Sequence, residues 1–135
     1  MTKIKVLSVS FLLLAAPAFA QTGAPQRLAP VDPPAPKVMA SVDLGAEFPA
    51  MQGYEFAQML MTVPPGAGWA WHSHTGSPEI VRILSGVLTD ARNGGAPTPY
   101  GPGSTLVNAQ GTQHMWANLG SEPVVFVATA IRLKK

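Results

Sequence analysis

The chain contains no cysteine, so disulfide bonds, thiolate metal ligands and a cysteine nucleophile are all excluded. Charged residues are also scarce, at 12% of a 135-residue chain of which 47% is hydrophobic. Histidine occurs only three times. Any chemistry must therefore come from these histidines, from carboxylates, from hydroxyl groups or from a bound cofactor.

The N-terminus has the three parts of a secretory signal. Lys3 and Lys5 form a basic start, residues 6–16 are mostly apolar, and residues 18–20 are a small-x-small cleavage signal. We therefore predict a signal peptide over residues 1–20 and a periplasmic or secreted protein. A transmembrane anchor is the alternative, but the apolar run is shorter than the roughly 20 residues that a membrane span requires. Without a cysteine a lipid anchor is excluded, so no membrane anchoring is expected after cleavage.

The net charge of +2 is carried by the predicted signal peptide. Lys3 and Lys5 account for the whole excess of nine basic over seven acidic residues. The chain without residues 1–20 is formally neutral, and we expect no nucleic-acid partner.

The remaining chain reads as one domain behind a leader. Residues 21–38 contain five prolines among alanine, glutamine and glycine, which predicts an extended, poorly ordered segment rich in proline and alanine. The folded domain is expected to span residues 39–135. No helix is predicted after the signal peptide.

Short apolar or alternating segments recur between turns rich in glycine and proline. This pattern is typical of a β-sandwich or barrel, and we predict an all-β fold. The predicted strands are Tyr54–Val63, Glu79–Leu84, Val87–Ala91, Ser104–Val107, His114–Ala117 and Val124–Leu133.

The three histidines are the first candidates for a functional site. His72 and His74 are two residues apart, so on a strand both imidazoles point to the same face. Glu79 follows after a turn of glycine, serine and proline, and His114 begins a later predicted strand. A histidine pair by itself would more often be a surface pair on an edge strand, so the interpretation depends on the wider spacing.

That spacing resembles the two motifs of the cupin superfamily. The first motif is matched at every position by Gly66, His72, His74, Glu79 and Gly86. The second is matched by Gly103, Gly111, His114 and Asn118, with Ala109 where the family usually has proline. The resemblance covers about residues 55–130, and the short stretch between the motifs is similar to small single-domain bacterial cupins, including dioxygenase-like ones.

The resemblance implies a double-stranded β-helix, a jelly-roll barrel, with a metal inside it. Its ligands would be His72, His74, Glu79 and His114. Three imidazoles and one carboxylate suit a divalent transition metal, namely Fe, Mn, Ni, Cu or Zn, and would leave one or two coordination positions open. Members of the superfamily often form dimers, so a homodimer is a further expectation.

Two more residues are candidates for the pocket wall. Trp116 shares strand parity with His114, although ordinary core packing explains it equally well. Gln58 would be a polar group in the pocket if its face of the first long strand points inward. The two faces of that strand comprise Tyr54, Phe56, Gln58, Leu60 and Thr62 on one side, and Glu55, Met59, Met61 and Val63 on the other.

The sequence lacks an evident second acid in the pocket. Asp90 and the other acidic residues besides Glu79 are expected at turns, at segment ends or, in the case of Glu55, opposite Gln58. This disfavours reactions that need a dedicated protein acid, such as oxalate decarboxylation or sugar epimerisation. A phosphate-binding loop is missing, and a Ser-His-Asp triad is not credible because all three histidines are already assigned.

Three functions follow from these features. The first is a metal-dependent, dioxygenase-like oxidoreductase that acts on a small chelating organic substrate. The second is a non-catalytic module that binds a metal or a small ligand, and the third is a metal-dependent lyase or isomerase. The fold does not choose among them.

Overall fold

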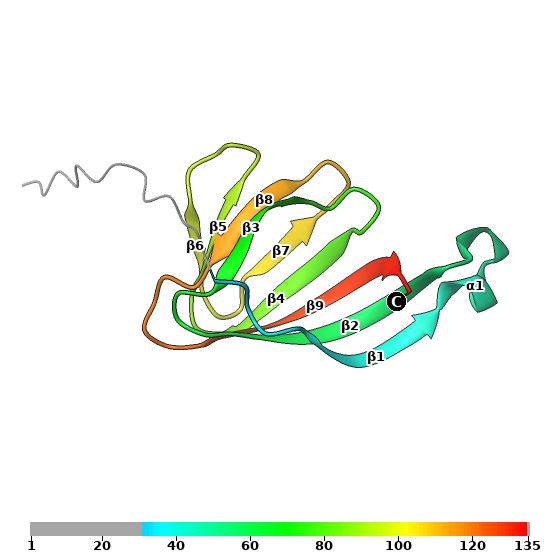
Figure 1. Cartoon of the computed structure of the whole chain (residues 1–135), viewed down its shortest axis with the longest axis horizontal. Coiled ribbons are helices and arrows are strands. Elements are labelled where there is room, and N and C mark those ends of the chain that lie inside the picture. Colours follow the sequence, from blue (N-terminus) through cyan, green and yellow to red (C-terminus); the bar gives the residue numbers. More distant parts are fainter. Residues whose placement is uncertain (1–30, 135) are drawn as a thin grey trace, which may run out of the picture.

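The computed structural model describes residues 31–134 (Figure 1). The predicted signal peptide and the first part of the predicted leader lie outside the described residues. Within residues 31–134, no helix combines the length and hydropathy that a membrane crossing would require.

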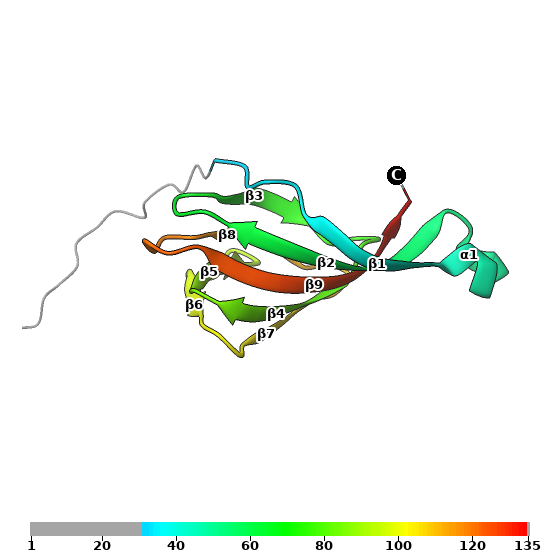
Figure 2. The same cartoon turned by 90° about the horizontal axis from the view of Figure 1, so that it is seen from below.

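The described chain forms two antiparallel sheets that face each other (Figures 1 and 2). The first has the order β1-β2-β9-β4-β7, and the second has the order β3-β8-β5-β6. The prediction of an all-β, double-stranded β-helix barrel is confirmed. The strands are β1 (Lys37–Asp43), β2 (Tyr54–Val63), β3 (Gly68–Ser73), β4 (Glu79–Ser85), β5 (Leu88–Arg92), β6 (Thr98–Tyr100), β7 (Thr105–Asn108), β8 (Gln113–Ala117) and β9 (Val124–Leu133).

The six predicted strands are present, and the two longest, β2 and β9, have the predicted bounds. The pattern missed β1, β3 and β6. Strand β3 does not show the expected alternation because the large apolar Trp69 and Trp71 on it are both exposed. Strand β6 is short and contains Pro99, a residue that usually marks turns or edges.

The prediction that no helix follows the signal peptide is wrong. The short helices α1 (Leu44–Glu47) and η1 (Pro49–Met51) connect β1 to β2, at the end of the first sheet (Figure 1). The Asp43 side chain accepts a hydrogen bond from the Gly45 backbone N–H and so caps α1. Four residues are too few for helical periodicity to show in the sequence.

The end of the predicted leader is attached to the barrel. Val31 forms a parallel bridge with Ala67, and its carbonyl accepts a hydrogen bond from the Gly68 N–H at 3.0 Å. Strand β1 then begins at Lys37, inside the segment predicted as leader. The chain thus passes from the edge of one sheet, β3, to the edge of the other, β1 (Figure 2).

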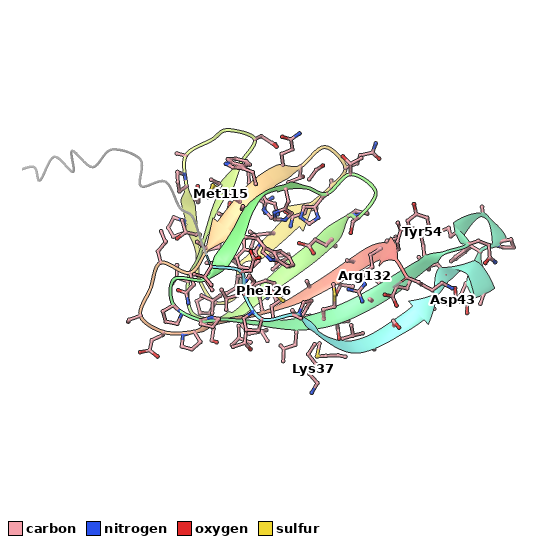
Figure 3. The ribbon with its side chains drawn as sticks, in the orientation of Figure 1. Lys37, Asp43, Tyr54, Met115, Phe126 and Arg132 are labelled. Carbon is pink, nitrogen blue, oxygen red and sulfur yellow. The ribbon has the colours of Figure 1, made fainter. Side chains whose placement is uncertain are left out.

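The hydrophobic core fills the space between the sheets. On β2 the buried face carries Ala57, Met59, Met61 and Val63, and Figure 3 shows Phe126 of β9 between the sheets. Gln58 is exposed on the outer face, so the prediction that it lines the pocket is wrong. The reason is that burying the two methionines and the valine gains more than burying an amide without a partner.

A buried asparagine secures the turn before β9. Asn118 is fully buried, and its Nδ2 donates to the carbonyls of Val63 and Glu122 at 2.9 and 2.8 Å. Its Oδ1 accepts from the Gly120 N–H at 3.0 Å. These bonds join the ends of two strands that lead into the core.

Candidate metal centre

Strands β3 and β8 bring the three histidines together. In their antiparallel pairing His72 lies directly opposite His114, and His74 follows just after the end of β3. The Nε2 atom of His114 is 2.9 Å from Nε2 of His74 and 3.0 Å from Nε2 of His72. His74 and His114 are buried, and ligand atoms of all three residues lie within 4.8 Å of one another.

The opposite nitrogen of each ring faces a hydrogen-bond acceptor. Nδ1 of His72 lies 2.8 Å from the Ala70 carbonyl, and Nδ1 of His74 lies 2.9 Å from the Ser77 carbonyl. Nδ1 of His114 lies 2.7 Å from Oδ1 of Asp90. Since these acceptors carry no proton, we assign the ring proton to Nδ1 in each histidine.

Three lone pairs consequently point at one another. Neutral Nε2 atoms without protons cannot form hydrogen bonds among themselves, so the arrangement calls for a cation between them. Two nitrogens at right angles on one ion, each about 2.1 Å from it, would be about 3.0 Å apart. The observed separations of 2.9 and 3.0 Å match that spacing, so the residues fit a divalent transition metal.

The electrostatics of His72 agree with this fit. Burial lowers the pKa of His72, and the neighbouring His114 and His74 lower it further, although the bond to the Ala70 carbonyl opposes the shift. The neutral imidazole that a metal requires is therefore favoured at neutral pH.

Glu79, the predicted fourth ligand, lies beside the histidines but outside the compact group of three. Its Oε1 is 3.6 Å from Nε2 of His74 and accepts a hydrogen bond from Asn108 Nδ2 at 2.7 Å. Glu79 is the first residue of β4 and also lines the central cavity. Its role as a metal ligand stays a prediction.

A second carboxylate, Asp90, lies behind His114, although the sequence predicted it at a turn or a segment end. Asp90 is an interior residue of β5, 1% exposed, and its Oδ1 is the acceptor for His114 Nδ1. Its Oδ2 accepts from Arg92 Nε. The expectation of a segment-end position was wrong, because β5 continues to Arg92 and its pairing with β8 places Asp90 opposite the buried Trp116.

Asp90 is expected to make the apoprotein sensitive to acid. Burial raises its pKa, but hydrogen bonds from His114 and Arg92 lower it more, so the pKa lies below its ordinary value of 3.8. A depressed folded-state pKa adds stability that is complete above the unfolded-state pKa and is lost as the pH falls through the folded-state pKa. The difference in unfolding free energy between wild type and Asp90→Asn should therefore shrink below about pH 4. Chemical denaturation of both apoproteins from pH 7 to pH 3 tests this, and a difference independent of pH would contradict it.

A cavity of about 390 Å³ opens in front of the histidines. The predicted pocket residue Trp116 lines it, and Gln58 does not. Most of the wall is apolar. Strand β2 contributes Met59 and Met61, which lie on the face opposite Gln58. The lining includes Ala35, Pro36, Met59, Met61, Trp69, Trp116, Phe126, Ala128 and Ala130.

One cation lines the cavity within the described residues. Arg132 of β9 donates from Nε to Glu55 Oε1 at 2.9 Å and from Nη1 to the Met59 sulfur at 3.0 Å. Arg132 lies directly opposite Glu55 in the pairing of β2 with β9, and Figure 3 shows Arg132 farther along β9 than Phe126. Strand parity could have identified Arg132, once the inward face of β9 was known.

Comparison with known proteins identifies the class. The family model described as "Cupin domain" matches residues 59–130, more than half of the chain. The chain therefore belongs to the cupin family, as its motifs indicated.

Relatives and solved structures agree with this assignment. Germin-like protein 1 of Brassica napus is 28% identical over 88 residues, which cover 62% of this chain and 42% of that protein. An auxin-binding protein of Prunus persica is 25% identical over 93 residues, covering 66% and 44%. The chain thus spans less than half the length of these curated relatives.

Two solved structures show the same fold at low identity. A protein with a double-stranded β-helix domain from Klebsiella pneumoniae is similar with a TM-score of 0.58 and 19% identity, covering 77% of this chain and 85% of that one. A predicted oxalate decarboxylase from Thermotoga maritima has a TM-score of 0.51 and 24% identity, covering 73% and 92%.

Proposed function

We propose that this protein is an exported, metal-dependent, dioxygenase-like oxidoreductase that acts on a small chelating organic substrate. The observation that carries the proposal is the convergence of three histidine lone pairs on one point at the wall of an apolar cavity. Export is supported by the signal-like features of residues 1–20. A divalent transition metal in this site would supply Lewis acidity and one-electron redox chemistry.

The residues of the chain provide orientation and exclude water. His72, His74 and His114, with Glu79 beside them, would hold the metal. The tryptophans Trp69 and Trp116 wall the cavity and suit a planar or apolar substrate body. Such a substrate would chelate the metal through an enolate or phenolate oxygen.

The wall of the cavity favours oxygenation over acid–base chemistry. Among residues 31–134, Glu79 is the single carboxylate that lines the cavity, because Glu55 and Asp90 are not part of its wall. If Glu79 is a ligand, no lining carboxylate remains to act as a dedicated general acid or base. Dioxygenation places both atoms of dioxygen in the product and requires no external reductant.

The test is oxygen uptake. Mature protein loaded with Fe(II) or Mn(II) should consume dioxygen in the presence of a flavonol, a catechol or a diketone, with one dioxygen per substrate consumed. The double variant His72→Ala/His114→Ala, treated in the same way, should show only the background rate. Failure of the wild type to take up oxygen with either metal and all three substrate classes would sink the oxygenase proposal.

The same absence of a spare acid or base favours a second candidate, a binding module without turnover. In that case a ligand would stabilise the metal-loaded protein against heat without forming product. A ligand at 100 times its dissociation constant should stabilise by about 2.7 kcal/mol. Thermal stabilisation in parallel with product analysis separates the two candidates.

A further inference from the structure

Behind the candidate ligands lies a second set of polar residues that do not line the central cavity. Asp90 and Arg92 belong to β5 of one sheet, and Asn108 is the last residue of β7 in the other sheet. Asp90 and Asn108 are each 1% exposed. Polar groups buried to this extent normally have a structural or functional reason to be there.

The first arm of this set runs from His114 to Arg92. His114 donates from Nδ1 to Asp90 Oδ1 at 2.7 Å, and Arg92 donates from Nε to Asp90 Oδ2. Arg92 also lies directly opposite His114 in the β5–β8 pairing. The Asp90 carboxylate is thus held at both oxygens, which fixes the plane and the tautomer of the His114 ring.

The second arm runs from Arg92 to Glu79. Arg92 donates from Nη1 to the carbonyl of Val107 at 2.9 Å, and that carbonyl belongs to the peptide bond that leads into Asn108. Asn108 in turn donates from Nδ2 to Glu79 Oε1 at 2.7 Å. The guanidinium therefore lies at the backbone of the residue that holds Glu79.

Two buried atoms of this set have no hydrogen-bond partner within residues 31–134. Arg92 Nη2 is a donor and Asn108 Oδ1 is an acceptor. Leaving such atoms unsatisfied is unfavourable. Their chemistry is complementary, and both side chains are anchored at the same Val107–Asn108 peptide.

Stability alone is a poor account of this arrangement. Ion pairs with a buried partner, such as Asp90 with the partly exposed Arg92, are often no more stabilising than apolar residues of similar volume, because removing a charge from water is expensive. Here the pair contacts a candidate metal ligand directly. A role in orienting His114 explains both the position of the Asp90–Arg92 pair and the burial of Asp90.

We propose that Asp90, Arg92 and Asn108 form one positioning network that holds His114 and Glu79 in a fixed relation behind the metal site. The inference rests on the proposed metal centre and extends it to residues on β5 and β7. The network connects the two sheets, so a change in either arm would alter the positions of both His114 and Glu79.

The experiment measures the dissociation constant for Mn(II) and Co(II) by competition with a chelator. Wild type is compared with Asp90→Asn, Asn108→Ala and the double variant. Each single change should weaken binding by about 10- to 100-fold, as loss of such outer partners does in other metal sites. Because the arms share Arg92, the fold-loss of metal affinity in the double variant should be smaller than the product of the fold-losses in the two single variants.

The variant Arg92→Met gives an independent test of the network. Removing a positive charge near the site would by itself tighten cation binding. The network predicts weaker binding, because Asp90 loses one of its two holds. Tighter binding in this variant would overturn the proposal.

Asp43→Asn is the matched control. Asp43 is exposed, it lies away from the site, and its Oδ2 is 2.8 Å from Lys134 Nζ. Its metal affinity should equal that of the wild type. The visible spectrum of bound Co(II) distinguishes positioning of the ligands from a purely structural role of Asp90. Its bands should change in Asp90→Asn but not in Asp43→Asn. Unchanged affinity in Asp90→Asn and Asn108→Ala, or a double loss equal to the product, would overturn the network. Absence of metal binding in the wild type would instead defeat the proposed function itself.

Discussion

Replacing His114 by alanine is expected to weaken binding of Mn(II) or Co(II) by more than about 100-fold, beyond the loss caused by an outer partner. His114 is central because its Nε2 lies 2.9 and 3.0 Å from Nε2 of the other two histidines. Its removal takes away one ligand and leaves Asp90 without the imidazole that it holds. Titration calorimetry or chelator competition on the apoprotein measures the effect.

Gln113→Ala provides the control for this prediction. Gln113 precedes His114 on β8 and is exposed, so its side chain points away from the site. The variant should bind metal with wild-type affinity. Because His114→Ala could also loosen the core, His72→Ala, which removes a less buried ligand, should show a similar loss. Wild-type affinity in both histidine variants would contradict the account.

Replacing Gly68 by alanine is expected to destabilise the fold by about 1–3 kcal/mol, as overpacking does, and to lower metal affinity as well. A Cβ atom at this position would lie 2.2 Å from the Trp116 carbonyl oxygen and 2.6 Å from the Ala117 Cα. These neighbours are backbone atoms, so β3 would have to move away from β8. The same movement would separate His72 from His114. Chemical denaturation and metal titration measure the two effects.

Gly101→Ala is the matched control for Gly68→Ala. Nothing lies within 4 Å of a Cβ built on Gly101, and its backbone does not need a positive φ. This variant should keep wild-type stability and metal affinity. If Gly68→Ala were as stable as Gly101→Ala, the close approach of β3 and β8 would be contradicted.

The site residues were more predictable than their surroundings. His72, His74 and His114 were predicted because the spacing of the two motifs resembles that of the cupin superfamily, whereas strand alternation alone places only His72 and His74 on one face. The long strands β2 and β9 are equally readable, because each has alternating or continuous apolar residues between clear turns. The strand signals are local in the sequence, whereas the meeting of His72 with His114 depends on the pairing of β3 with β8.

Which face of a strand points inward was not predictable for β2. Gln58 and Met59 alternate, and the choice between them depends on the pairing of β2 with β9, which is not a local property. The position of Asp90 behind His114 likewise depends on the pairing of β5 with β8. Residues that touch only across strands have no fixed spacing in the chain.

The central claim is that three histidines hold one divalent transition metal, and native mass spectrometry with elemental analysis tests it most directly. Protein purified without added metal, or loaded with Mn(II) or Co(II), should carry one ion per chain. The variant His72→Ala/His114→Ala, purified and loaded in the same way, should carry none. Equal metal content in wild type and variant would contradict the account.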